Sequence, residues 1–253
     1  MTRTVRTDVI SAVVLAAVAV VVLLVGDGKP WLGLPVTATF VRPPEAPTGS
    51  PVELATAEAS VSLAVVQLPD AVAMLLLFLA GLRALSLVAA VRARRHRAMH
   101  ADRHTTRWIE YSQVGGVVTF LVAQLNGITA VTSLVPLYAL GAAGGMLLWL
   151  HDRRTATGRA GLWAFGFGAA IAVVPWGVIA FAQVGGGLVE VGPGILIRIV
   201  TIAALLALAT VWVGVWVLGR GERTPEIGTR VDRMLALTIP LAPIVLAVGV
   251  AVG

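Results

Sequence analysis

The sequence predicts an all-α membrane protein: a single domain over residues 1–253 that forms a bundle of seven transmembrane helices, with an external β-hairpin in its first loop. The composition is the first reason, because 58% of the 253 residues are hydrophobic and only 13% are charged, which is too apolar for a soluble domain. The second reason is a series of apolar runs of about 17 to 25 residues, each long enough to cross a membrane. The third is that arginines gather in every second connection between these runs.

Seven apolar segments are the expected membrane spans. The third is the least regular of them, because Glu110, Gln113 and Gln124 interrupt its apolar residues. The last contains Pro240 and Pro243, which should kink the helix because proline lacks a backbone donor. The expected spans cover residues 9–25, 70–91, 106–125, 128–150, 162–183, 194–218 and 234–252.

Small residues cluster inside several of these spans, at residues 115–116, 141–145, 166 and 168. In lipid, small residues let two helix backbones approach closely. We interpret these clusters as helix-packing positions rather than as ligand sites.

The distribution of charge predicts how the chain is oriented in the membrane. The connections on one side carry nearly all of the arginines, whereas the other side is mainly acidic, with Lys29 and Arg42 as its basic residues. Because basic loops stay in the cytoplasm, we expect a multi-pass protein of the cell membrane with a cytoplasmic N-terminus and an extracellular C-terminus. The arginines on the basic side are Arg3, Arg6, Arg92, Arg94, Arg95, Arg97, Arg103, Arg107, Arg153, Arg154, Arg159, Arg220, Arg223, Arg230 and Arg233.

The same charges limit the expected partners. The isoelectric point is about 11.1, but topology accounts for it, so we expect no nucleic acid partner. Anionic membrane lipid is a better match for the arginine-rich loop at residues 92–107. That loop is also where a cytoplasmic protein partner would bind.

The loop at residues 27–69 is the only long one. Residues 36–41 and 61–66 are rich in β-branched side chains and partly alternating, and a proline-rich turn lies between them. A two-stranded hairpin is therefore predicted, with a disordered proline-rich loop as the alternative. An isolated hairpin is marginally stable in water, so we expect it to pack on the helix ends or to pair across a homodimer.

Two charged residues fall inside expected spans. Such residues usually face the bundle interior and have a partner. Arg83 in the second span and Glu110 in the third should approach each other, because the two spans run in opposite directions. The alternatives are that Arg83 extends to the membrane interface, and that Glu110 pairs with Arg107 or Arg103 or is protonated.

Other chemistry has little support in the sequence. His96, His100 and His104 recur at every fourth residue, but a solvated basic helix face explains them better than a metal site. There is no cysteine, and no nucleotide-binding glycine loop, metalloprotease motif or catalytic triad is apparent. We therefore expect neither an enzyme nor a metal protein.

Three motifs resemble those of the heliorhodopsins. Residues 107–112 read Arg-Trp-Ile-Glu-Tyr-Ser, residues 121–128 read Leu-Val-Ala-Gln-Leu-Asn-Gly-Ile, and residues 174–176 read Val-Pro-Trp. The resemblance covers nearly the whole chain and implies an opsin-like fold. It also makes Glu110 the counterpart of the family's Schiff-base counterion, and it implies that the side chains facing the ligand include Trp108, Tyr111, Ser112 and Trp176.

The chain departs from that family at the residue that binds retinal. Residues 230–233 resemble the start of the family's last helix, and an ungapped count from there puts Pro243 at the position of the retinal lysine. The only lysine in the chain is Lys29, in the first loop. Because a stable retinal imine requires a lysine amine, we expect no covalent cofactor and no light sensing by the family's usual mechanism.

Two classes of function remain from the sequence. The first is a signalling or scaffolding protein that works without retinal, through its arginine-rich loops and a hairpin dimer. The second is a protein that binds an apolar ligand, such as a retinoid, carotenoid or lipid, non-covalently inside the bundle. In either class, Arg83 would supply the positive charge that a Schiff base otherwise provides to Glu110.

Overall fold

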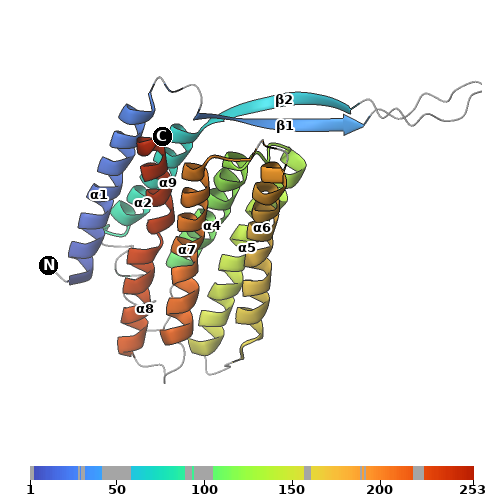
Figure 1. Cartoon of the computed structure of the whole chain (residues 1–253). Coiled ribbons are helices and arrows are strands. Elements are labelled where there is room, and N and C mark those ends of the chain that lie inside the picture. Colours follow the sequence, from blue (N-terminus) through green and yellow to red (C-terminus); the bar gives the residue numbers. More distant parts are fainter. Residues whose placement is uncertain are drawn as a thin grey trace, which may run out of the picture.

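The computed structural model describes residues 3–27, 29, 32–41, 58–88, 93, 105–156, 161–188, 190, 192–218 and 225–253. Within these residues, seven roughly parallel helical units form a bundle, and a two-stranded hairpin lies across one end of it (Figure 1). The N-terminus lies at the opposite end from the hairpin, and the C-terminus lies beside the hairpin. The predicted seven-helix fold with a hairpin in the first loop is confirmed.

Each expected span corresponds to a helix whose ends differ from the prediction by at most six residues, except at the start of the last span. Six of the seven units are single helices, and the seventh is formed by α8 and α9 together. The bounds are α1 Arg3–Gly26, α2 Leu68–Leu85, α4 Thr105–Leu125, α5 Val131–Ala156, α6 Trp163–Leu188, α7 Ile195–Leu218, α8 Pro225–Thr238 and α9 Leu241–Val252.

The last span was predicted to begin at residue 234, and this is wrong because its helix begins at Pro225. The charged first turns of α8 are amphipathic: Arg230 and Arg233 are exposed, whereas Val231 and Asp232 are buried. Because these turns are charged, hydropathy alone assigns them to a loop. Their buried side chains nevertheless pack against the other helices of the bundle. The predicted kink is a break between α8 and α9 at Pro240.

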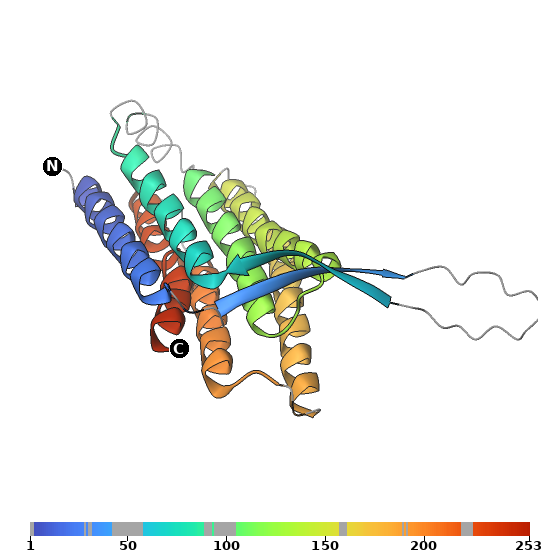
Figure 2. The ribbon, with the colours of Figure 1, turned by 90° about the horizontal axis from the view of Figure 1, so that it is seen from above.

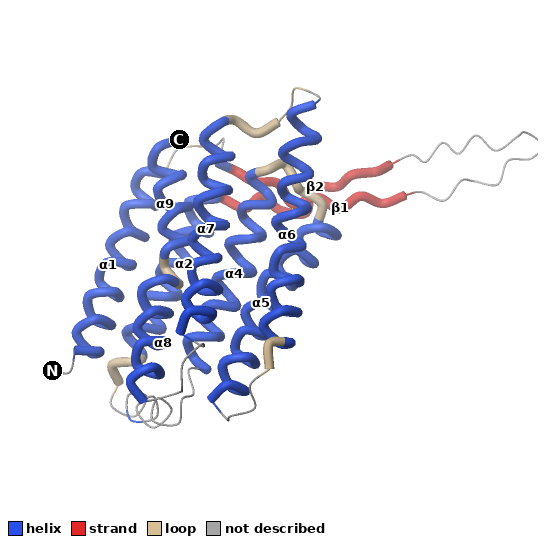
Figure 3. The backbone as a smooth tube through the Cα atoms, turned by 60° about the horizontal axis from the view of Figure 1, so that its bottom comes forward, coloured by secondary structure: helices blue, strands red, loops and turns tan. Residues whose placement is uncertain are grey.

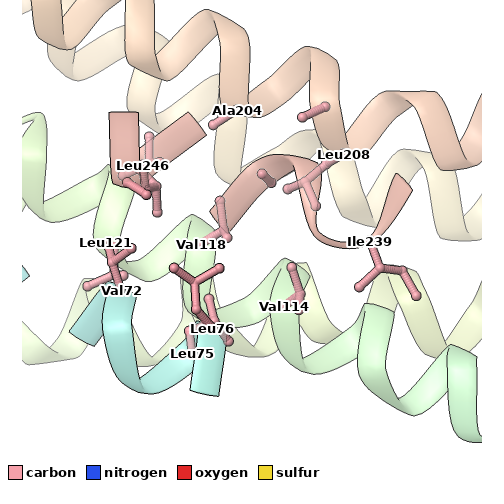
Figure 4. Packing of buried hydrophobic residues seen from close by; sticks show 14 of the residues in the cluster. Val72, Leu75, Leu76, Val114, Val118, Leu121, Ala204, Leu208, Ile239 and Leu246 are labelled. Atoms are coloured by element: carbon pink, nitrogen blue, oxygen red, sulfur yellow. The ribbon is translucent and has the colours of Figure 1, made fainter. Parts of the chain in front are cut away.

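Helix α4 is the central helix of the bundle. Six helical segments of the described chain are long and apolar enough to cross a membrane by themselves, and α4 is not one of them. Fourteen of its 21 residues are buried, so its polar side chains face protein rather than lipid. It packs against α5 and also reaches α2, α6, α7, α8 and α9. Figure 4 shows the aliphatic core around it, in which Val118 and Leu121 belong to the same cluster as Leu76 and Leu246.

The hairpin consists of β1 Gly33–Val41 and β2 Glu58–Gln67, paired antiparallel with an irregularity between Val36 and Thr37. Its base packs on the helix ends, as expected. The Thr37 amide donates to the Thr129 carbonyl at 2.9 Å, and Gln124 Nε2 donates to the Leu34 and Pro35 carbonyls at 3.4 and 3.3 Å. The outer part extends beyond the bundle (Figures 2 and 3). The proline-rich connection lies outside the described residues.

Candidate functional site

Five charged side chains from four helices meet inside the bundle, and we call them the charge cluster. They are Asp8 of α1, Arg83 of α2, Arg107 and Glu110 of α4, and Asp232 of α8, and each residue is at most 4% exposed. Asp8, Arg107 and Glu110 lie in the first turns of their helices, and Arg83 lies in the last turn of its own. The cluster therefore occupies the end of the bundle opposite the hairpin.

Arg107 contacts all three carboxylates of the charge cluster. Its Nη2 donates to Asp8 Oδ1 at 2.8 Å, and its Nη1 donates to both oxygens of Glu110 at 3.1 Å. Its Nε lies 3.5 Å from Asp232 Oδ1. One guanidinium thereby ties α1, α4 and α8 together, a geometry that suits the fork of donors in arginine.

Arg83 brings the second positive charge to the same carboxylates. Its Nη2 lies 3.2 Å from Glu110 Oε2, and its Nη1 lies 3.7 Å from Asp8 Oδ1. The predicted approach of Arg83 to Glu110 is confirmed. The alternative in which Arg83 extends to the interface is wrong, because its side chain is fully buried. The alternative pairing of Glu110 with Arg107 occurs at the same time.

A proline in the last helix provides a further partner for Arg83. Pro240 has no amide hydrogen, so the carbonyl of Ala236, four residues earlier, has no helical donor. Arg83 Nη2 donates to this carbonyl at 3.3 Å. The guanidinium thus links the break between α8 and α9 to Glu110.

Sequence reasoning missed Asp8 and Asp232 as members of this cluster. Asp8 falls one residue before the expected first span, and Asp232 lies among arginines in the expected last loop. A carboxylate at the start of an apolar helix is a weak signal by itself. Nothing in the local sequence shows that α1 and α8 meet at Arg107.

An aromatic cavity of about 250 Å³ lies beside this cluster, between α4, α5, α6 and α7. Tyr111, Phe165, Trp176 and Trp212 provide its aromatic walls, and the Phe165 and Trp212 rings lie 5.3 Å apart, edge to face. The other residues that line it are small or aliphatic, with one threonine: Gly115, Thr119, Gly141, Gly145, Ala169, Ala172, Val173, Leu205, Leu208 and Ala209. Such a cavity suits a flat apolar molecule.

Comparison with known families bears on both features. The sequence model of the heliorhodopsin family matches residues 5–217. The chain belongs to the heliorhodopsin family. The matched residues of this heliorhodopsin family member include the motifs of α4 and α6, whereas α8 and α9 follow them. Among curated proteins, none matches the chain.

Four of the predicted site residues belong to the charge cluster or to the aromatic cavity. Glu110 and Arg83 belong to the charge cluster, and Tyr111 and Trp176 line the aromatic cavity. Pro243 is buried in α9, and no residue of α8 or α9 lines the cavity. Phe165 and Trp212 were missed, because the many aromatic residues of lipid-facing helices give no sign of which ones face inward.

Trp108 and Ser112 have structural partners instead. Trp108 Nε1 donates to Asp152 Oδ2 at 2.9 Å, and Ser112 Oγ donates to the Ala142 carbonyl at 2.8 Å. The Tyr111 hydroxyl, in the cavity wall, donates to the Leu208 carbonyl at 3.0 Å. These three bonds hold α4 against α5 and α7 in this heliorhodopsin family member.

Within the part of the chain that the structure describes, no group of three histidine or acidic side chains is arranged to hold a metal. His96, His100 and His104 lie outside the described residues. His151 packs its ring against Phe165 at 5.5 Å.

Proposed function

We propose that this member of the heliorhodopsin family forms no Schiff base with retinal and instead holds a flat apolar ligand, a retinoid or carotenoid, non-covalently in the aromatic cavity. The cavity between α4, α5, α6 and α7 carries the proposal. A bundle filled by its own side chains would have favoured a purely scaffolding role. Glu110 belongs to the charge cluster and does not line the cavity. The polar side-chain groups of the cavity lining are the hydroxyl groups of Tyr111 and Thr119.

The position of the single lysine supports non-covalent binding of the ligand. Lys29 is the only lysine in the chain. It lies between α1 and β1, where its Nζ donates to the Val250 carbonyl at 3.4 Å. None of the helices carries a side-chain amine that could form an imine with retinal.

The charge cluster supports the same proposal. In a rhodopsin-type site, the protonated Schiff base provides the cation beside the counterion. Here Arg83 and Arg107 both contact Glu110. Two guanidinium groups therefore balance this buried carboxylate without any cofactor, and we assign Arg83 the role of the substitute cation.

The ligand would enter from the bilayer. Val173 of α6 and Leu205 of α7 line the cavity, and both are exposed on the outside of the bundle. An apolar molecule dissolved in the membrane therefore reaches the cavity between α6 and α7 without crossing water.

All-trans-retinol tests the ligand directly, because an alcohol cannot form an imine. We expect saturable binding, measured by energy transfer from tryptophan to retinol. Ala169→Phe should weaken it at least about tenfold, or about 1.4 kcal/mol, because Ala169 lines the cavity. The matched control Ala170→Phe, on the exposed side of the same helix, should bind like the wild type. Equal binding by both variants, or the absence of saturable binding for retinol and β-carotene alike, contradicts the proposal.

A second experiment tests the missing imine. After incubation with all-trans-retinal, the wild-type protein should show no visible absorption band, and after a subsequent reduction with borohydride it should show no covalent adduct by mass spectrometry. Pro243→Lys should gain both, because it puts an amine inside the bundle at the position that matches the retinal lysine of the family. A wild-type adduct that disappears in Lys29→Arg would show instead that the lone lysine binds retinal.

The exposed hairpin supports a second function, scaffolding by a homodimer. Phe40, Val61, Leu63 and Val65 are all exposed on the hairpin, and exposed apolar patches mark interaction surfaces. We propose that a second copy of the chain covers them. With the N-terminus in the cytoplasm, the arginines at positions 92–103, before α4, would be available to a cytoplasmic partner, although most of these residues lie outside the described part of the chain. Arg107, which the sequence assigned to the same loop, is buried in the charge cluster instead.

The dimer is tested by light scattering of the protein in detergent. We expect the protein mass to fall from twice the 26.2 kDa of one chain to that of a single chain in the double variant Leu63→Asp/Val65→Asp. The matched control Ser60→Asp/Ser62→Asp adds the same charges at exposed polar positions of the same strand. A wild-type monomer, or a dimer that survives the apolar substitutions, rules this interface out.

A further inference from the structure

A second cavity lies at the hairpin end of the bundle, where the base of the hairpin meets α2, α4, α7 and α9. Its volume is about 260 Å³. Every side chain that lines it is aliphatic, and two glycines complete the wall. It shares no lining residue with the aromatic cavity, so it is a separate site.

The chemical character of the lining residues indicates which kind of molecule this cavity can bind. Among the described residues no polar side chain lines it, so only backbone groups could provide the two to four polar partners that a buried water needs. An apolar cavity of about 150 Å³ is known to stay dry and to admit benzene, and this cavity is larger. None of the described residues that line it has an aromatic ring on which a flat conjugated molecule could stack. Flexible aliphatic walls match a flexible saturated chain instead.

The position of the cavity makes the membrane the source of such a chain. Leu196 and Ile197, in the first turn of α7, line it and are partly exposed. Ile195 and Ile199 beside them are exposed on the outside of the bundle. The start of α7 therefore joins the cavity to the outer surface of the bundle, which a bilayer would cover.

We propose that this cavity binds the acyl chain of a membrane phospholipid. The chain would contact Leu32 and Leu34 at the base of the hairpin on one side, and Val200 and Leu246 on the other. The bound lipid would then fill the space between the hairpin and the last two membrane spans. This inference is independent of the ligand in the aromatic cavity.

A photoreactive lipid tests the proposal. The full chain is reconstituted in vesicles of phosphatidylcholine with a diazirine near the end of one acyl chain, irradiated, and mapped by peptide mass spectrometry. Two residues of α9 act as reporters: Leu246 lines the cavity and is 1% exposed, whereas Val248 faces the lipid. Val200→Phe fills the cavity, and Ile199→Phe is the matched control on the lipid-facing side of the same helix.

We expect label on both Leu246 and Val248 in the wild type and in Ile199→Phe. In Val200→Phe the label on Leu246 should fall at least fivefold, while the label on Val248 stays. If that variant does not fold, Leu196→Phe fills the cavity from its more exposed rim and should give the same loss. Label on Val248 without label on Leu246 in the wild type overturns the proposal. So does label on Leu246 that survives in a folded cavity-filling variant.

Discussion

Replacement of Arg83 by leucine is expected to destabilise the folded protein by about 3–5 kcal/mol. The variant leaves Glu110 and Asp8 with less compensation inside the bundle, because Arg83 lies 3.2 Å from the first and 3.7 Å from the second. It also leaves the carbonyl of Ala236 without its donor. Thermal or denaturant unfolding in detergent measures the loss. Arg198→Leu, which removes an exposed arginine, should change the free energy of unfolding by about 0.5 kcal/mol or less.

A double-mutant cycle separates the Arg83–Glu110 pair from the rest of the cluster. Glu110→Gln alone should destabilise the protein, because Arg83 and Arg107 both lose a charged partner. Added to Arg83→Leu, the same substitution removes a buried charge that has kept only Arg107 as its partner, and it should restore about 1 kcal/mol or more, within the range for coupled neighbours. If Glu110→Gln restores nothing to Arg83→Leu, the two residues are not coupled and Arg83 does not act as the substitute cation.

Replacement of Gly141 by valine is expected to have the second-largest effect, because α4 and α5 cross there with no room for a side chain. A Cβ atom at Gly141 would lie 2.9 Å from the Gly115 carbonyl oxygen and 2.9 Å from Thr119 Oγ1. Backbone cannot move aside easily, and overpacking costs about 1–3 kcal/mol or more. We expect Gly141→Ala to fall in this range and Gly141→Val to exceed it. Since Gly141 also lines the aromatic cavity, retinol binding should weaken as well.

Gly177 of α6 is the matched control for this crossing. A Cβ atom there meets nothing within 4 Å, so Gly177→Ala should be neutral or should stabilise the helix by up to about 1 kcal/mol. The contrast is measured as the free energy of unfolding of the wild type, Gly141→Ala, Gly141→Val and Gly177→Ala under the same conditions. If Gly141→Ala and Gly177→Ala lower the free energy of unfolding equally, then Gly141 is not needed for the close packing of α4 on α5.

Much of the fold was predictable from the sequence, because the membrane imposes a simple pattern. Length and hydropathy located the spans, and strand alternation located the hairpin. The pattern was weakest where a helix is surrounded by protein. Helix α4 is not apolar enough to cross a membrane by itself, yet most of its residues are buried, because its neighbours rather than lipid satisfy its side chains. The charged start of α8 was missed for the same reason.

The site was predictable only in part. The approach of Arg83 to Glu110 followed from the opposite directions of two neighbouring spans. The roles of Asp8 and Asp232 did not, because each contacts Arg107 across a boundary between helices that are distant in the sequence. The same holds for Phe165 and Trp212, which meet in the cavity wall although they lie on different helices.

The sequence by itself determined that this chain is a multi-span membrane protein of heliorhodopsin type, and that Lys29 is its only lysine. These conclusions follow from composition, spacing and the chemistry of single residues. Only the tertiary structure decided that two arginines and three carboxylates share one buried site, and that an aromatic cavity stands apart from the last helix. Such features depend on which helix faces meet, and that choice is made by packing over the whole bundle.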